Sequence, residues 1–166
     1  MPLSVSKIHT RETMKRERNR LREARLQLVF TNGCFDLLHP GHVRYLNEAR
    51  QQGDRLLVAV NTDETVAKLK GPERPLVPVA ERMEVLSALV IVDYVIPFEE
   101  ETPAGVIREL VPDVLVKGGD WPIEQIVGRD TVEAAGGKVL SLPFAPGYST
   151  SQLIELIVER LGGTGS

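Results

Sequence analysis

Short apolar runs alternate along the chain with longer segments in which apolar residues recur at helical spacing. The runs predict strands at Leu26–Phe30, Arg55–Val60, Tyr94–Pro97, Val114–Lys117 and Lys138–Leu142. The longer segments predict helices at Gly41–Gln52, Val79–Leu89, Pro103–Leu110, Ile123–Ala135 and Ser149–Leu161. Strands that alternate with helices through short connections are typical of a parallel sheet covered on both faces. We therefore expect an α/β fold with a five-stranded parallel sheet and a ligand site at the carboxyl ends of its strands.

The two ends of the chain differ from this alternating body. Residues 11–25 carry seven basic and three acidic side chains and few apolar ones. This pattern predicts a solvated helix that packs loosely on the domain, and we expect an arm at residues 1–25 that the chemistry does not need. A basic arm that binds nucleic acid is the alternative, although the segment has no aromatic residue. The domain itself is expected at residues 26–161 and a frayed tail at residues 162–166.

The composition narrows the class of protein. The formal net charge is −3, which does not favour nucleic acid as a partner. The single cysteine, Cys34, excludes an internal disulfide framework and fits a reducing compartment. No apolar run reaches the length of a transmembrane helix, and the N-terminus lacks the apolar stretch of a secretory signal. We therefore expect a cytoplasmic protein that acts on small molecules, with no nucleic-acid or membrane partner.

The most informative segment lies between the first predicted strand and the helix that follows it. It reads G-C-F-D-L-L-H-P-G-H from Gly33 to His42. A glycine turn between a buried strand and a helix directs backbone N–H groups and the positive end of the helix dipole at an anion. His39 and His42 stand on either side of Gly41, which has no Cβ and lets a ligand come close. Two imidazoles and a row of amides around one anion indicate phosphate chemistry.

Two other interpretations of these histidines stay open at this point. Histidines at helical spacing serve more often in cores or as helix caps than in catalysis. A zinc site formed by Cys34, His39 and His42 is the second interpretation. Structural zinc takes four ligands, however, and the chain has no other cysteine to complete the set.

A cationic connection follows the second predicted strand. Residues 65–78 contain Lys68, Lys70 and Arg74 among glycines and prolines. Such a segment is not expected to be helical throughout, and we interpret it as a flap whose lysines neutralise a triphosphate. Arg82 stands early in the helix that comes next.

Two later segments also follow predicted strands. Two glycines in Lys117–Trp121 allow a ligand to approach the backbone, where Trp121 either stacks on a base or fills the rim. Three hydroxyls at Ser149–Ser151 precede the last helix. Because one hydroxyl suffices to cap a helix, the excess favours phosphate binding.

The segment Gly33–His42 resembles the signature of the HxGH nucleotidyltransferases, G-x-F-D-x-x-H-x-G-H, at every fixed position. Such enzymes transfer a nucleotidyl group from a nucleoside triphosphate to a phosphate or phosphate ester and release pyrophosphate. The resemblance implies a single Rossmann-like nucleotidyltransferase domain, with Mg²⁺ bound mainly through the ATP phosphates and no metal ligand from the protein. It implies that Asp36 orients the loop. It implies catalytic roles for His39, His42 and Lys70, and nucleotide contacts by Gly33, Cys34, Phe35, Asp36, Gly41, Arg82, Lys117, Gly118, Asp120, Ser149 and Thr150.

Over residues 27–160 the order of these segments is similar to that of the adenylyltransferases that make ADP-heptose from ATP and heptose 1-phosphate. This resemblance implies ATP and a sugar 1-phosphate, D-glycero-β-D-manno-heptose 1-phosphate, as substrates of a stand-alone adenylyltransferase, and we expect a homo-oligomer. Gln152 departs from the Lys or Arg that many adenylyltransferases carry after the Ser-Thr pair.

The glycerol-3-phosphate cytidylyltransferases are the alternative family. They carry Arg-Thr-Glu-Gly-Ile-Ser-Thr before the last helix, where this chain has Phe-Ala-Pro-Gly-Tyr-Ser-Thr at residues 144–150, and Val90 replaces one of their arginines. The missing cations favour the adenylyl reading. A nucleotide-binding module without catalysis is a further alternative, against which the intact histidines argue.

Overall fold

A computed structural model describes residues 7–162 of the protein. Residues 1–6 of the predicted arm and residues 163–166 of the predicted tail lie outside the described residues. All strands in the sheet run parallel, in the order β3-β2-β1-β4-β5. The expected α/β fold with a five-stranded parallel sheet is therefore confirmed. The strands are β1 (Leu28–Gly33), β2 (Arg55–Asn61), β3 (Tyr94–Phe98), β4 (Val114–Gly118) and β5 (Lys138–Leu142).

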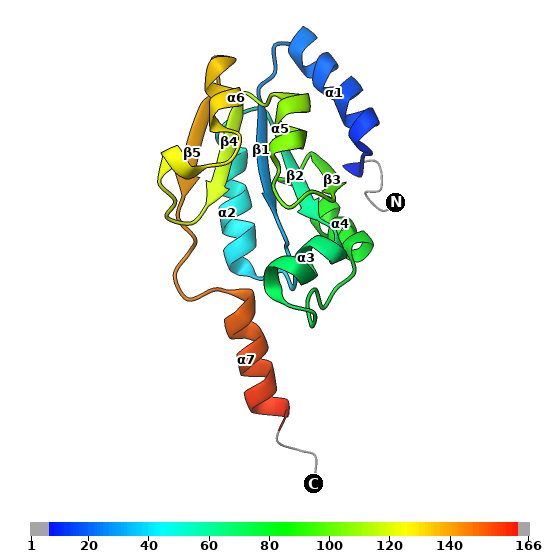
Figure 1. The fold of residues 1–166 in the computed structure, drawn as a ribbon, viewed down its shortest axis with the longest axis vertical. Coiled ribbons are helices and arrows are strands. Elements are labelled where there is room, and N and C mark those ends of the chain that lie inside the picture. The colour runs from blue at the N-terminus through cyan, green and yellow to red at the C-terminus, as the bar shows by residue number, and fades with distance from the viewer. Residues whose placement is uncertain (1–6, 163–166) are drawn as a thin grey trace.

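Helices cover both faces of this sheet, as the alternating pattern predicted (Figure 1). Buried side chains of α1, α5 and α6 form one core cluster with the sheet, and those of α2 and α4 form the other. Because both faces are buried, the central strands are nearly continuous apolar runs rather than alternating ones. The helices are α1 (Arg11–Glu23), α2 (Pro40–Arg50), α3 (Asp63–Lys70), α4 (Val79–Ala88), α5 (Ala104–Leu110), α6 (Arg129–Ala134) and α7 (Thr150–Leu161).

Strand β1 ends three residues later than its apolar run predicted. Thr31 is polar but fully buried, because its hydroxyl lies 2.6 Å from the hydroxyl of Tyr45 on α2. This hydrogen bond satisfies both groups inside the core. The strand therefore continues to Gly33 and delivers the glycine-histidine segment to the edge of the sheet.

Two predicted connections differ from the structure. The single helix expected over residues 123–135 is a 3₁₀ turn at Ile123–Gln125 followed by α6. The chain bends at Gly128, where φ is +89° and a Cβ would lie 2.6 Å from Ile107. Helix α3 occupies the first half of the expected flap, so the flap without helical structure is confined to residues 71–78.

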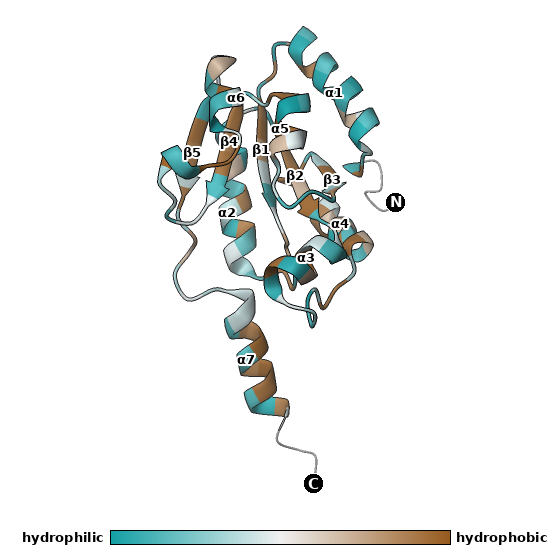
Figure 2. Ribbon diagram, viewed as in Figure 1, coloured by the Kyte–Doolittle hydropathy of each residue, from teal (hydrophilic) through white to brown (hydrophobic). Residues whose placement is uncertain are grey.

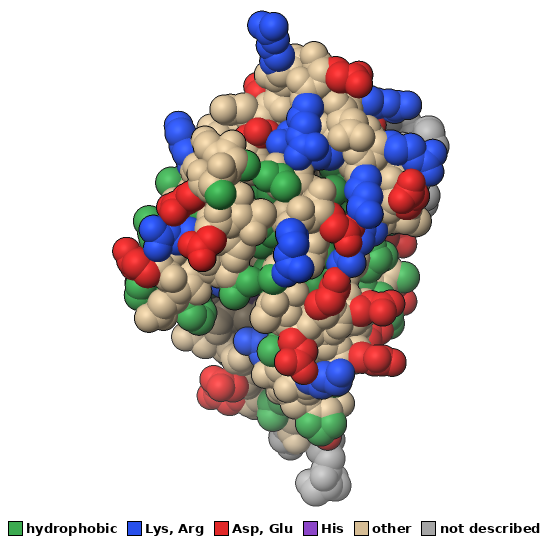
Figure 3. Space-filling model, turned by 45° about the horizontal axis from the view of Figure 1, so that its top comes forward, with side chains coloured by type: hydrophobic (Ala, Val, Ile, Leu, Met, Phe, Trp, Pro, Cys, Tyr) green, Lys and Arg blue, Asp and Glu red, His purple; other side chains and the backbone are tan. Residues whose placement is uncertain are grey.

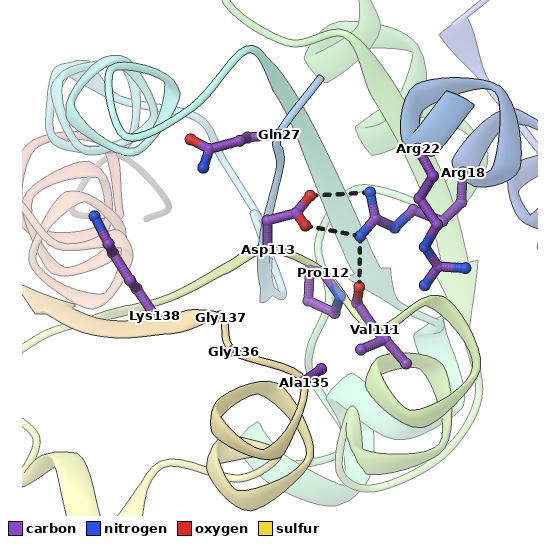
Figure 4. A pocket seen from close by; sticks show the side chains of 10 residues that line it. All are labelled: Arg18, Arg22, Gln27, Val111, Pro112, Asp113, Ala135, Gly136, Gly137 and Lys138. Carbon is purple, nitrogen blue, oxygen red and sulfur yellow. Dashed lines mark hydrogen bonds and ion pairs between the residues drawn. The ribbon is translucent and has the colours of Figure 1, made fainter. Parts of the chain in front are cut away.

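Helix α1 is packed closely, and the expectation of a loosely packed helix is wrong. Met14 and Leu21 are buried in the core, and Arg18 is only 4% exposed. Arg18 donates to the carbonyl of Leu110 at the end of α5 and forms an ion pair of 2.9 Å with Asp113 (Figure 4). The sequence did not predict this packing, because an arginine in a charged segment is expected to face solvent.

The Arg18–Asp113 pair lies beside a small cavity of about 250 Å³ at the amino end of the sheet. Helices α1, α5 and α6 all end near it. Arg18 and Arg22 both donate to the carbonyl of Leu110 at the end of α5, so these two cations are partners of the negative end of that helix.

Helix α7 extends away from the domain and contributes no buried residue (Figures 1 and 2). Its apolar side chains form a broad stripe, with Ile157 44% and Leu161 70% exposed. Over the face shown in Figure 3, basic and acidic side chains are interspersed. None of the helices within residues 7–162 is long and apolar enough to span a membrane.

Candidate active site

A cavity of about 640 Å³ is lined by residues at the carboxyl ends of β1 and β4 and at the start of α7. The strand order reverses between β1 and β4, and parallel sheets bind ligands at such points. Three predicted residues, Gly41, Arg82 and Asp120, do not line the cavity. The predicted residues that do line it are Gly33, Cys34, Phe35, Asp36, His39, His42, Lys70, Lys117, Gly118, Ser149 and Thr150.

The two histidines of the motif form a stacked pair. Their ring centroids are 3.9 Å apart, with an interplanar angle of 26°. The backbone N–H of His39 donates to Nδ1 of His42 at 3.3 Å. A neutral imidazole that accepts at Nδ1 carries its proton on Nε2. His42 can therefore offer an N–H donor to a phosphate oxygen without being charged.

Burial sets the charge of this pair. It lowers the pKa of His42 to about 4, and the neighbouring His39 contributes to the same shift. Burial also lowers the pKa of His39. Both rings are therefore neutral at pH 7 in the free protein. A polyanion bound against them would favour the charged forms and raise both pKa values.

Asp36 holds the flap to the motif loop. Its carboxylate is buried and accepts hydrogen bonds from Nε of Arg74 and from the backbone N–H groups of Leu76 and Val77. Burial alone would raise the pKa of Asp36, but these three donors hold it below its ordinary value. The carboxylate is thus occupied by residues 74–77. The backbone carbonyl of Asp36 accepts a hydrogen bond from the Thr150 hydroxyl at 2.8 Å.

Arg82 is 2% exposed and joins three loops instead of facing the cavity. Its guanidinium donates to the carbonyls of Cys34, Asn61 and Val77, and it pairs with Asp63 at 2.7 Å. Arg82 therefore supports the ends of β1 and β2, and it lies outside the lining of the cavity where a nucleotide contact was expected.

Cations line two sides of the cavity. Lys70 ends α3 and is exposed at the rim. Lys117 lies near the end of β4, where burial lowers its pKa, and its ammonium lies 5.5 Å from the ring centroid of Trp121. An anionic ligand would raise the pKa of this lysine again.

The hydroxyls that precede α7 have partners within the protein. Oγ of Ser149 caps the helix by accepting from the N–H of Gln152 at 3.1 Å. The hydroxyl of Thr150 donates a hydrogen bond to the backbone carbonyl of Asp36, so its single O–H is not available to a phosphate oxygen. The excess of hydroxyls over capping needs is therefore smaller than the sequence suggested. The O–H of Ser149 and the first N–H groups of α7 are still able to donate.

Sequence reasoning missed several aromatic residues of the cavity wall, two of which, Phe144 and Tyr148, lie close to the motif. Phe144 lies over Gly118, where a Cβ would come within 2.6 Å of its ring, and it contacts Tyr45 at a centroid distance of 5.5 Å. Tyr148 lies over the ring of His39. Both residues belong to the loop between β5 and α7, and only the fold brings that loop to the motif.

Side chains that bind metals are not clustered in the structure. Residues 7–162 contain no group of three or more His, Cys, Asp or Glu side chains that could hold a metal ion. Burial raises the pKa of the Cys34 thiol, which disfavours the thiolate that zinc requires. The zinc interpretation therefore finds no support in this geometry. A Mg²⁺ ion held through ligand phosphates and water would need no such group.

Comparison with known proteins agrees with this geometry. The cytidylyltransferase-like family model matches residues 30–156. The chain belongs to the cytidylyltransferase-like family. The matched segment begins in β1 and ends in α7, so it covers the sheet and the cavity.

The curated relatives are longer proteins. The bifunctional protein HldE of Hydrogenovibrio crunogenus is 60% identical over 133 residues, which are 80% of this chain and 28% of that protein. The HldE of Halorhodospira halophila is 58% identical over 139 residues, 84% of this chain and 29% of that protein. This cytidylyltransferase-like chain thus spans less than a third of their length.

A solved structure shares the fold. It is the lipopolysaccharide core biosynthesis protein of Thermoplasma volcanium, with a TM-score of 0.59 and 27% identity over 72% of this chain and 97% of that one. The nucleotidyltransferase-like fold expected from the motif is therefore shown.

Proposed function

We propose that this chain transfers the adenylyl group of ATP to a sugar 1-phosphate, D-glycero-β-D-manno-heptose 1-phosphate, and releases pyrophosphate. The observation that carries the proposal is the stacked pair of His39 and His42, which faces a cavity with lysines on two sides. The identity to HldE proteins and the likeness to a lipopolysaccharide core biosynthesis protein support the sugar.

The chemistry needs no general base, because the acceptor phosphate is already anionic. Its oxygen attacks the α-phosphorus in line, a new P–O bond forms, and the bond to the bridging oxygen of pyrophosphate breaks with its electron pair. Catalysis then depends on positioning and on stabilising charge in the transition state. His42 donates from Nε2 to the α-phosphate, and His39 contacts the adjacent phosphate.

The triphosphate lies between the motif loop and α7. Backbone N–H groups at Gly33–Phe35, the O–H of Ser149 and the amino end of α7 receive its oxygens. Lys70 closes over the β- and γ-phosphates or the sugar phosphate. Mg²⁺, held through the phosphates, would neutralise charge that these residues leave.

Adenine fits the apolar side of the cavity. Trp121, Val127 and Phe144 line that side, next to Gly118. Phe144 stands where the cytidylyl motif carries arginine, so the wall offers a stacking surface in place of a cation. This replacement supports ATP over CTP. A cytidylyltransferase that uses a small phosphate ester is the second candidate, which the family name favours.

A panel of acceptors tests the sugar. The protein is given ATP and Mg²⁺ with heptose 1-phosphate, hexose 1-phosphates or glycerol 3-phosphate, and pyrophosphate release is measured. We expect the heptose 1-phosphate to give the highest kcat/KM. Faster turnover of glycerol 3-phosphate would contradict the acceptor assignment.

We also propose a cytoplasmic homo-oligomer that acts on small molecules alone. The exposed apolar stripe of α7 supports self-association. Salt bridges of α1 argue against a nucleic-acid arm, because Arg11 pairs with Glu100 and Lys15 with Glu109. Light scattering should give a mass above that of one chain, and Ile157→Glu should lower it.

A further inference from the structure

We propose that Tyr148 is a positioning residue whose ring, held by Arg44, fixes the His39 imidazole against His42 in the geometry that receives the triphosphate. The inference rests on the adenylyl transfer proposed above. It goes further by assigning a role to a residue outside the histidine motif.

The first observation is a series of ring contacts. The rings of Tyr148 and His39 are nearly parallel, at 15°, with centroids 6.1 Å apart. His39 in turn stacks on His42 at 3.9 Å, and the ring of Phe35 lies 5.5 Å from that of His42 at a tilt of 52°. The guanidinium of Arg44 lies 5.1 Å from the Tyr148 centroid. These contacts link Arg44 through Tyr148 and the two histidines to Phe35.

The second observation is the reason for the glycine in the motif. A Cβ at Gly41 would come within 2.7 Å of Cβ of Tyr148 and within 2.9 Å of the His39 ring. The bare Cα of Gly41 thus admits both side chains at once. Gly41 does not line the cavity, and its missing side chain leaves the space that Tyr148 and His39 occupy.

The third observation is that His39 has little else to hold it. Its Nδ1 is buried and has no hydrogen-bond partner within the described part of the chain. Ring contacts with Tyr148 and His42 therefore fix the plane of this imidazole. The same loop is tied down one residue later by the Ser149 cap and then by the hydrogen bond from Thr150 to Asp36. A cation over an aromatic face contributes modestly at an exposed site, so Arg44 steadies the ring without carrying the whole arrangement.

The test compares Tyr148→Ala with Tyr148→Phe, which keeps the ring. With ATP, Mg²⁺ and heptose 1-phosphate, we expect Tyr148→Ala to lower kcat about tenfold and to change KM for ATP by less than about threefold, because misplacing a reacting contact costs rate more than binding. Tyr148→Phe should keep kcat within about twofold of wild type. Arg44→Met should give an intermediate loss. Wild-type kcat in Tyr148→Ala, or an equal loss in Tyr148→Phe, would overturn the proposal.

A measurement without substrate separates this inference from the proposed function. The NMR resonance of the His39 ring should shift in Tyr148→Ala and stay in place in Tyr148→Phe, with thermal unfolding as the check on folding. If wild type transfers no nucleotide although the resonance shifts in Tyr148→Ala, the proposed function fails while the placement of the His39 ring by Tyr148 stands. If wild type is active and the resonance does not move in Tyr148→Ala, the positioning role alone is contradicted.

Discussion

The backbone N–H of His39 donates a hydrogen bond to Nδ1 of His42, at 3.3 Å, in the first turn of α2. The motif thus fixes the tautomer of its own second histidine. Protonation of Nδ1 would place two donors face to face, and burial already lowers the pKa of His42 to about 4. His42 is therefore a neutral hydrogen-bond donor in the free protein.

Substitution of His42 should separate this role from acid–base catalysis. We expect His42→Ala to lower kcat by about 10²-fold, the scale of losing one preorganised donor. His42→Gln should recover part of the loss, because its amide can place an N–H near the position of Nε2. Steady-state kinetics give both values, and His9→Ala, at a histidine that packs on Tyr94, is the control. Equal losses in the Ala and Gln variants would argue for proton transfer instead.

The stability of the free protein should fall as the pH is lowered from 7 to 5. His42 has a pKa of about 4 when folded and about 6.5 when unfolded. Between these values the unfolded chain binds more protons, so acid favours unfolding. Urea unfolding at the two pH values measures the loss, which His42→Gln should reduce. If the pH dependence of stability is unchanged in His42→Gln, a group other than His42 causes it.

Removal of the Asp36 charge should loosen the flap. Asp36→Asn loses the ion pair with Arg74, and its side chain has one acceptor oxygen for three donors. We expect unfolding to require about 1–3 kcal/mol less and residues 71–78 to be cleaved faster by protease. Glu73→Gln, an exposed acid in the same segment, is the matched control. Equal cleavage of both variants would show that Asp36 does not hold the flap.

Helix α1 should stabilise the fold without entering the chemistry. Arg18→Ala leaves Asp113 without its cation and should cost about 3 kcal/mol in urea unfolding. Arg20→Ala, on the same helix with an exposed side chain, should change stability by less than about 0.5 kcal/mol. The kcat/KM of the folded Arg18→Ala protein should equal that of wild type. A large loss of activity in a folded variant would mean that α1 reaches the site.

Much of the fold follows from the sequence. Buried parallel strands are apolar runs, and apolar residues recur at helical spacing in the helices between them. Helix α3 escaped prediction because its charged sequence is followed directly by Gly71 and Pro72. The burial of Arg18 escaped because its partners, Leu110 and Asp113, lie more than ninety residues away. Local pattern contains no information on such contacts.

In the candidate site, too, local motifs were predicted and long-range contacts were not. The histidine motif and Lys117 are local signals at strand ends, and the structure brings them to one cavity. The sequence could not show that three backbone carbonyls occupy the guanidinium of Arg82, or that Arg82 lies outside the cavity lining. Tyr148 was missed because its contact with His39 spans the whole fold.

The choice of nucleotide decides between adenylyl and cytidylyl transfer. The protein is incubated with heptose 1-phosphate, Mg²⁺ and either ATP or CTP, and the products are identified by mass spectrometry alongside pyrophosphate release. We expect ADP-heptose with one pyrophosphate for each product molecule, and a higher kcat/KM for ATP than for CTP. Equal or faster turnover of CTP would contradict adenylyl transfer while leaving the fold and the histidine pair as described.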